Sequence, residues 1–129
     1  MVQKYKVEGF EAFEAKLADI QREFAGKTVL VLFSGSKDPK THQSWCPDCV
    51  TAEPVVQACL DKAPEPEQVV FLYVGVGSRE FWKDPQCIFR THQSTQLKAV
   101  PTLIKWGSPQ RLEESQCNRP DMVEMLFDD

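Results

Sequence analysis

The chain has 129 residues, of which 42% are hydrophobic and 26% charged, and its formal net charge at pH 7 is −4. A chain of this size and composition buries about two-thirds of the surface that its unfolded form exposes, which predicts one compact domain and excludes a disordered or fibrous protein. The 15 basic residues are scattered along the sequence, so we expect no nucleic-acid partner.

The hydrophobic pattern near the N-terminus predicts a strand, a helix and a second strand. A short strand over 5–7 precedes an amphipathic helix over 10–24, whose apolar residues recur at spacings of three and four. Gly26 is expected to end this helix. The near-continuous apolar run over 28–33 then predicts a central strand buried on both faces of a sheet.

The next part of the chain predicts a loop, a second helix and a third strand. Residues 34–44 are mostly polar or loop-forming and predict a long loop. A helix is expected from Cys46 to about Lys62, with a kink at Pro54, because an interior proline removes one backbone hydrogen bond. The apolar run over 68–74 predicts the strand that follows.

The segment over 80–92 shows a weaker pattern. Asp84 is a candidate N-cap and Pro85 suits a first helical turn. We therefore predict a short helix that begins at these two residues.

The last third of the chain predicts a hairpin and a terminal helix. The strands are expected over 102–106 and 111–114, and the helix over 120–127 with Asn118 as its candidate cap. Taken with the preceding elements, this order predicts an α/β fold in which helices flank a central mixed sheet, as a single domain over 1–129.

Two of the five cysteines stand close together in the stretch SWCPDCV, residues 44–50. They could form half of a metal site, a structural disulfide or a reactive dithiol. No apolar run approaches the roughly 18 residues that cross a bilayer, and the first residues lack a signal-peptide pattern. We therefore expect a cytoplasmic protein with no membrane partner. In that reducing compartment structural disulfides are rare, and an odd cysteine count does not suggest a disulfide framework.

A zinc site would need a second close pair of ligands. The remaining cysteines and histidines are instead dispersed: Cys59, Cys87, Cys117, His42 and His92. We therefore favour a reactive dithiol and expect no metal. Cys59 is expected in the core, Cys87 and Cys117 are expected to be partly exposed, and all three to be inert.

The predicted helix start distinguishes Cys46 from Cys49. A helix N-terminus stabilises a thiolate through its unpaired N–H groups and its dipole. We predict that Cys46 attacks a substrate disulfide and that Cys49 then attacks Cys46 to release the reduced product. Asp48 is expected to tune reactivity or partner choice, because its charge opposes a second anion, and Trp45 is a candidate for substrate contact.

Several stretches together carry a family resemblance: VLVLFSGSKD, SWCPDCVTAEPVV, EFWKDP, KAVPTLIKWG and DMVEMLF. Over essentially the whole chain they resemble the thioredoxin superfamily, and more closely its Clot family of small cytosolic thioredoxin-related proteins. The resemblance implies a thioredoxin fold with Cys46 as nucleophile and Cys49 as resolving thiol. It also implies a cis-proline loop, Val100-Pro101, facing the dithiol. Pro47 and Asp48 inside the motif, with Val100 and Pro101, are expected to bind substrate or tune the dithiol.

The resemblance also implies an activity. The protein is expected to be a disulfide reductase with no bound cofactor, whose Cys46-Cys49 disulfide receives electrons from NADPH through thioredoxin reductase. Its implied substrates are small disulfides such as cystine and selected protein disulfides, with roles in peroxide handling, denitrosylation and tumour-necrosis-factor signalling. We expect a monomer. The alternative is a non-catalytic thioredoxin-fold module that holds a signalling partner.

Two departures from ordinary thioredoxin bear on mechanism. Thioredoxin has a buried aspartate in the strand before the motif, and the matching position here is Leu32. The proton of Cys49 therefore lacks an obvious acceptor, for which water, Asp48 and Glu53 are candidates. The loop over 34–44 is also longer than the link in thioredoxin, so the surface beside Cys46 should exclude some protein partners.

Overall fold

The sheet is the centre of the structure, a computed structural model that describes residues 1–127. It has five strands in the order β1-β3-β2-β4-β5. Strands β1 and β2 both run parallel to β3, whereas β4 is antiparallel to β2 and β5 is antiparallel to β4. The strands are β1 (Gln3–Glu8), β2 (Thr28–Ser34), β3 (Val69–Gly75), β4 (Thr102–Lys105) and β5 (Arg111–Glu113). The predicted α/β architecture with a mixed sheet is confirmed.

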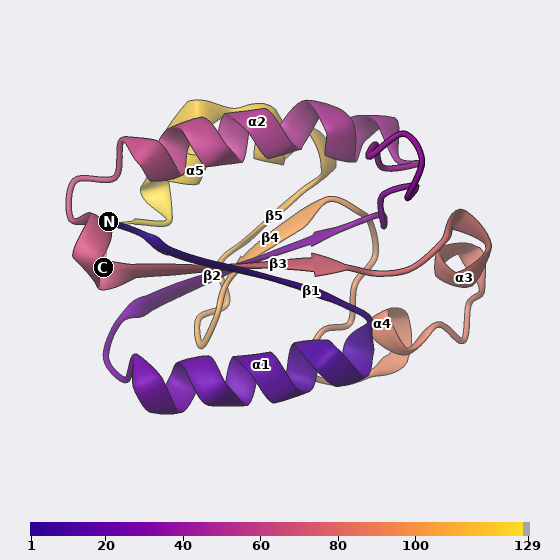
Figure 1. Ribbon diagram of the computed structural model, residues 1–129, viewed down its shortest axis with the longest axis horizontal. Helices are drawn as coiled ribbons and strands as arrows, with labels where there is room; N and C mark the ends of the chain where they lie inside the picture. The colour runs from indigo at the N-terminus through magenta and orange to yellow at the C-terminus, as the bar shows by residue number, and fades with distance from the viewer. Residues whose placement is uncertain (128–129) are drawn as a thin grey trace.

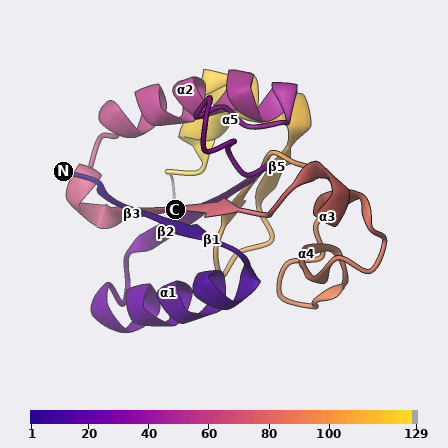
Figure 2. The same ribbon diagram turned by 45° about the vertical axis from the view of Figure 1, so that its right-hand side comes forward.

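Helices cover both faces of this sheet (Figure 1). Helix α1 lies on one face, and α2 and α5 lie on the other, while α3 and α4 lie beyond the end to which β2 and β3 point (Figure 2). The α-helices are α1 (Phe10–Glu23), α2 (Pro47–Asp61), α3 (Arg79–Lys83), α4 (Ile88–Thr91) and α5 (Pro120–Met125). The 3₁₀-helices are η1 (Pro66–Gln68) and η2 (Glu114–Asn118). Among the helices described, none has the length and apolar character that crossing a bilayer requires.

Strand alternation divides the core into two halves. In β2, Val29, Val31 and Phe33 pack on the side of α1, whereas Leu30 and Leu32 pack on the side of α2. Since successive side chains of a strand point to opposite faces, a strand covered on both sides must be apolar throughout. This explains the uninterrupted run over 28–33 and confirms that it forms a central strand.

The segment over 79–92 folds differently from the prediction. Helix α3 begins at Arg79 with Ser78 as N-cap, whose hydroxyl accepts from the Phe81 N–H, and Asp84 follows the end of that helix. The carboxylate of Asp84 accepts the Gln86 N–H at 2.9 Å, which forms a turn. The predicted helix start at Asp84 was wrong, because an aspartate side chain satisfies backbone N–H groups in turns as well as at helix caps.

The start of the C-terminal helix also differs from the prediction. Asn118 does not cap α5. It is the last residue of η2, and Arg119 occupies the N-cap position, with Pro120 in the first turn. A reciprocal capping box between Glu113 and Gln116 stabilises η2. Because Asn118 belongs to this 3₁₀-helix, it is not available to cap α5.

Candidate active site

The dithiol lies where β2 leads into α2. Helix α2 begins at Pro47, and Cys46 is its N-cap residue with an extended backbone. The Cys46 sulfur accepts the Cys49 N–H at 3.2 Å, so a sulfur fills the role that a hydroxyl or carboxylate oxygen usually has at an N-cap. The helix continues past Pro54. The expected helix start at the motif is therefore confirmed, with Cys46 at its cap.

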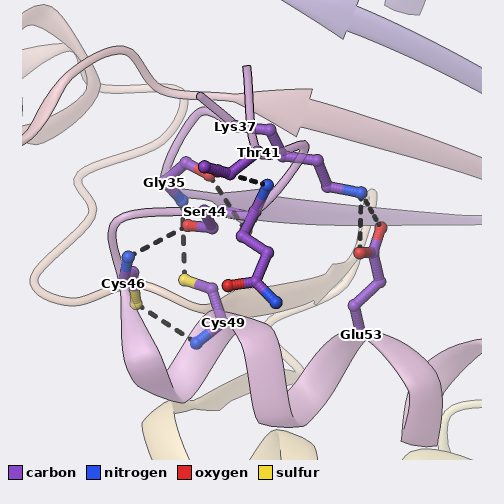
Figure 3. A network of polar contacts seen from close by, with 9 residues as sticks. Gly35, Lys37, Thr41, Ser44, Cys46, Cys49 and Glu53 are labelled. Atoms are coloured by element: carbon purple, nitrogen blue, oxygen red, sulfur yellow. Dashed lines mark hydrogen bonds and ion pairs between the residues drawn. The ribbon is translucent and has the colours of Figure 1, made fainter. Parts of the chain in front are cut away.

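Each sulfur has its own backbone neighbour. The Cys46 thiol lies 3.6 Å from the Val100 carbonyl, immediately before the Val100-Pro101 peptide bond, which is cis as the resemblance implied. The Cys49 sulfur accepts the Gly35 N–H at 3.5 Å (Figure 3). The fold thus brings together the β2–α2 loop, the start of α2 and the loop before β4.

The two thiols have unequal acidity. A hydrogen bond from the Cys49 thiol is the largest cause that lowers the pKa of Cys46 to about 7, against burial and the Asp48 charge, which raise it. The pKa of Cys49 is raised, first by the hydrogen bond to Cys46 and then by burial, although Ser34 and Gly35 act in the opposite direction. At neutral pH, Cys46 is therefore substantially thiolate while Cys49 is a thiol.

This difference predicts a pH profile for alkylation. Reaction of Cys46 with iodoacetamide should rise with pH through a midpoint of about 7, because only the thiolate reacts. Asp48→Asn should move that midpoint lower, since the Asp48 charge raises the pKa of Cys46. Peptide mass spectrometry between about pH 5 and pH 9 measures both, and Cys46→Ser provides the blank. A midpoint near the ordinary cysteine pKa of about 8.5 would contradict the assignment.

Trp45 is fixed beside the dithiol. Its indole N–H donates to the Gly77 carbonyl at 2.8 Å, which ties the active-site loop to the turn after β3. A Cβ at Gly35 would lie 2.6 Å from the Trp45 ring, so the ring and the backbone can pack closely only with glycine there. Pro47 and Asp48 are exposed at the start of α2.

The long loop is a folded structure. Lys37 and Ser44 form a bridge across it, and the Asp38 carboxylate accepts the Lys40 N–H at 2.7 Å. The Lys37 ammonium lies 2.8 Å from the Glu53 carboxylate, which joins the loop to α2 (Figure 3). His42 is exposed in this loop.

Basic side chains surround the cavity next to Cys46. This cavity of about 450 Å³ is lined by Trp45, Cys46, Pro47 and Val100, by four cationic residues, Arg79, Lys83, Arg90 and Lys98, and by one acidic residue, Glu114. Arg90 is held in place, because its guanidinium lies 3.9 Å from the Trp82 ring centre and its Nε donates to the Trp82 carbonyl. The sequence does not reveal this cluster, since its members come from α3, α4 and the loop before β4.

Leu32 lies among other apolar side chains. It is 1% exposed and packs with Leu30, Ala52 and Leu103 in the core below α2. Its neighbour across the sheet is Tyr73 of β3. The sequence had not singled out Tyr73 as a site residue. The signal was available in the alternation of β2 and β3, which directs every second residue toward the helix bearing the dithiol.

The remaining cysteines are buried and separate. Cys59 lies in the core, as predicted, but Cys87 and Cys117 are 3% and 0% exposed, so their expected partial exposure was wrong. Cys87 packs in the α1 half of the core and Cys117, from η2, in the α2 half. Burial raises the pKa of Cys117 to about 12, which keeps it protonated. Within residues 1–127, His, Cys, Asp and Glu side chains form no group placed to hold a metal ion.

Comparison with known proteins points to one family. A family model for the thioredoxin domain of thioredoxin domain-containing protein 17-like proteins matches residues 6–129. The chain is 46% identical over 125 residues to thioredoxin domain-containing protein 17 of Mus musculus, covering 97% of this chain and 94% of the relative. It is 34% identical over 115 residues to thioredoxin-like protein Clot of Arabidopsis thaliana, covering 85% and 84%.

The fold has a counterpart among solved structures. Thioredoxin O1 from Arabidopsis thaliana, in its oxidized state, superposes with a TM-score of 0.52 and 21% sequence identity, covering 86% of this chain and 85% of that one. The fold is therefore that of thioredoxin. With the match over residues 6–129 and the identity to full-length relatives, the chain belongs to the thioredoxin domain-containing protein 17-like family of thioredoxin-fold redox proteins.

Proposed function

We propose that the protein is a disulfide reductase that uses Cys46 and Cys49. The observation that carries this proposal is the position of Cys46 at the N-cap of α2, where its sulfur accepts the Cys49 N–H at 3.2 Å. Consistent with this, the pKa of Cys46 is lowered to about 7 and that of Cys49 is raised. A thiolate at neutral pH supplies the nucleophile, and a neighbouring thiol supplies the group that resolves the intermediate.

The first step is attack by the Cys46 thiolate on one sulfur of the substrate disulfide. A bond forms between these two sulfurs, the substrate S–S bond breaks, and the leaving thiolate takes a proton from solvent. Cys46 thereby loses its charge and can no longer accept the hydrogen bond from the Cys49 thiol that is the largest cause of the raised Cys49 pKa. Formation of the mixed disulfide therefore makes Cys49 easier to deprotonate.

The second step is attack by Cys49 on the Cys46 sulfur. The Cys46-Cys49 disulfide forms, the bond from Cys46 to substrate breaks, and the substrate leaves as a thiolate that takes up a proton. In the cytoplasm, thioredoxin reductase would return the disulfide to two thiols with electrons from NADPH. Membership in the thioredoxin domain-containing protein 17-like family supports this assignment.

The basic side chains of the cavity favour disulfide substrates that carry carboxylates. Four basic side chains beside Cys46, in a chain of net charge −4, attract carboxylates locally. We therefore include cystine and protein disulfides with acidic neighbours among the proposed substrates. The proposal extends to peroxide handling, denitrosylation and redox control of signalling, which use the same dithiol.

A coupled assay tests the activity. Purified protein with thioredoxin reductase is expected to oxidise NADPH when cystine is added, and faster than when insulin is the substrate, because the loop beside Cys46 limits access. Thioredoxin provides the comparison. If no disulfide supports NADPH oxidation, the non-catalytic interaction module becomes the better description.

A charge series tests the cavity. Reduction of dithiodipropionate, which carries two carboxylates, should be faster than reduction of cystamine, which carries two ammonium groups, and the difference should shrink as salt is added. Lys98→Glu should lower the dithiodipropionate rate about two- to fivefold, the factor that corresponds to an exposed ion pair. Lys62→Glu makes the same charge change at the end of α2, away from the cavity. Equal effects of the two variants would show that only net charge matters.

A further inference from the structure

Ser34 and Tyr73 lie beneath the resolving thiol without a role in the steps above. Ser34 ends β2 and is 2% exposed, and Tyr73 of β3 is 3% exposed. Alternation along the two strands directs both side chains to the face that α2 covers. There Ser34 lowers the pKa of the Cys49 thiol and that of the Tyr73 hydroxyl, so both groups lie near its side chain.

The Tyr73 hydroxyl makes no hydrogen bond to Ser34 or to any other residue that the structure describes. Among the residues that the structure describes, it is one of two buried side-chain polar atoms that lack a hydrogen-bond partner, with the Asn118 carbonyl oxygen. A buried hydroxyl without a partner is unfavourable. Such a group is expected either to reflect strain or to gain a partner in another state of the protein.

The surroundings of Cys49 offer donors in place of a carboxylate. The Gly35 N–H already points at the Cys49 sulfur from 3.5 Å. The Ser34 hydroxyl has a long 3.5 Å contact with the Gly35 carbonyl, a weak bond that it can exchange for one to a thiolate. Leu32 occupies the position of the thioredoxin aspartate and contributes no polar group.

We propose that the Gly35 N–H and the Ser34 hydroxyl form a thiolate-binding site for Cys49, with Tyr73 as the positioning residue that donates to Ser34. When Cys49 loses its proton, Ser34 turns its O–H toward the sulfur, and its oxygen then accepts the Tyr73 O–H. The isolated hydroxyl of Tyr73 thus gains its partner in the state that reacts. This inference rests on the proposed reductase function and explains how its second step proceeds without a buried carboxylate.

The resolving step balances without a further reactant. Cys49 releases its proton to solvent, its sulfur bonds to Cys46, and the bond between Cys46 and the substrate sulfur breaks with the electron pair on the substrate. The departing thiolate then takes up one proton. The donors act on the negative charge that builds on Cys49 as the proton leaves, and hydrogen bonds to a charged group are stronger than neutral ones.

Charged groups from three elements face Tyr73. Lys6 of β1 and Lys37 of the long loop lie 5.6 and 5.4 Å from its ring centre. Glu8 of β1 and Glu53 of α2 add to burial in raising the pKa of Tyr73 to about 12. Tyr73 therefore stays a neutral donor throughout the pH range in which the dithiol reacts.

A single-turnover experiment separates the two steps. Reduced protein is mixed with the chromogenic disulfide dithiobis(nitrobenzoate), and release of the first thionitrobenzoate reports attack by Cys46. Release of the second reports attack by Cys49. Ser34→Ala is expected to leave the first rate unchanged and to slow the second at least about tenfold at neutral pH, the factor for losing one hydrogen bond to a charged group.

Tyr73→Phe tests the positioning role. It should also slow only the second release, it should add nothing in the Ser34→Ala background, and its urea midpoint should equal or exceed that of the wild type because an unpaired buried hydroxyl is removed. Tyr5→Phe is the matched control, since it removes the other phenolic oxygen. The pKa of Cys49, followed by the Cβ chemical shift in Cys46→Ser protein, should rise in both active-site variants.

The two release rates distinguish the thiolate-binding site, the positioning role of Tyr73 and the proposed function. An unchanged second rate in Ser34→Ala would overturn the thiolate-binding site, and additive effects of the two substitutions would overturn the positioning role of Tyr73. Slowing of both steps together would indicate a structural effect and also count against it. Absence of the first release from the wild-type protein would instead contradict the proposed function.

Discussion

Cys46→Ser is expected to abolish disulfide reduction, lowering the rate in the coupled assay at least about a thousandfold. A serine hydroxyl stays protonated at neutral pH, whereas the pKa of the Cys46 thiol is about 7. The substitution is nearly isosteric and leaves an oxygen to cap α2, so the fold should be retained. Thermal unfolding and the rate of NADPH oxidation measure the two properties separately.

Cys49→Ser should have a different consequence. Attack by Cys46 still occurs, but the intermediate lacks a resolving thiol, so the protein should accumulate as a mixed disulfide with its substrate. Intact-protein mass spectrometry detects the added mass, and dithiothreitol removes it. Cys59→Ala is the control, because Cys59 lies on the same helix but apart from the dithiol. A mixed disulfide that accumulates in Cys46→Ser protein and not in Cys49→Ser protein would reverse the assigned roles.

Local sequence patterns predicted much of the fold. The apolar runs of β2 and β3 and the three-and-four spacing in α1 are repeated signals, each reinforced by several residues. The position of Cys46 at a helix start follows from a short motif between a buried strand and a helix. The cis bond before Pro101 came from family resemblance alone, because sequence by itself favours the trans form at most X-Pro bonds.

The features that sequence analysis missed depend on contacts between distant segments. Arg79, Arg90 and Lys98 line one cavity only because α3, α4 and the loop before β4 meet at the end of the sheet. Cys117 seemed exposed because its neighbours in sequence are polar, but η2 directs it into the core. The short helices α3 and α4 carry too few residues for a periodic pattern to locate them.

The place of Ser34 near Cys49 and Tyr73 depends partly on a local sequence pattern and partly on contacts between distant segments. Strand alternation predicts the face on which Ser34 and Tyr73 lie, but it does not reveal that α2 places Cys49 next to the hydroxyl. The resemblance to thioredoxin points to Leu32, where that protein has a carboxylate. The structure points two residues further along β2, to Ser34, whose side chain lowers the pKa of Cys49, and to the adjacent Gly35, whose N–H donates to the Cys49 sulfur.

Leu32→Asp, which places a carboxylate where the resemblance to thioredoxin implies one, is expected to destabilise the protein by about 4 kcal/mol or more at neutral pH. Replacing a buried leucine by a smaller residue costs about 2–5 kcal/mol, and an unpaired carboxylate adds a further penalty. Leu32 is 1% exposed among aliphatic neighbours. Because single domains are stable by about 5–15 kcal/mol in total, this loss is a large part of the available stability. Urea unfolding measures it.

The pH dependence of that loss separates charge from packing. Burial raises the pKa of the new carboxyl above its unfolded value of about 3.9, so the folded state binds more protons than the unfolded state above that pH. The stability of Leu32→Asp should therefore fall, relative to the wild type, as pH rises from about 4 toward the folded pKa. Leu32→Asn has nearly the same shape without the charge and should show a loss that does not depend on pH. Equal, pH-independent losses in both variants would mean that this fold accommodates a carboxylate beneath α2.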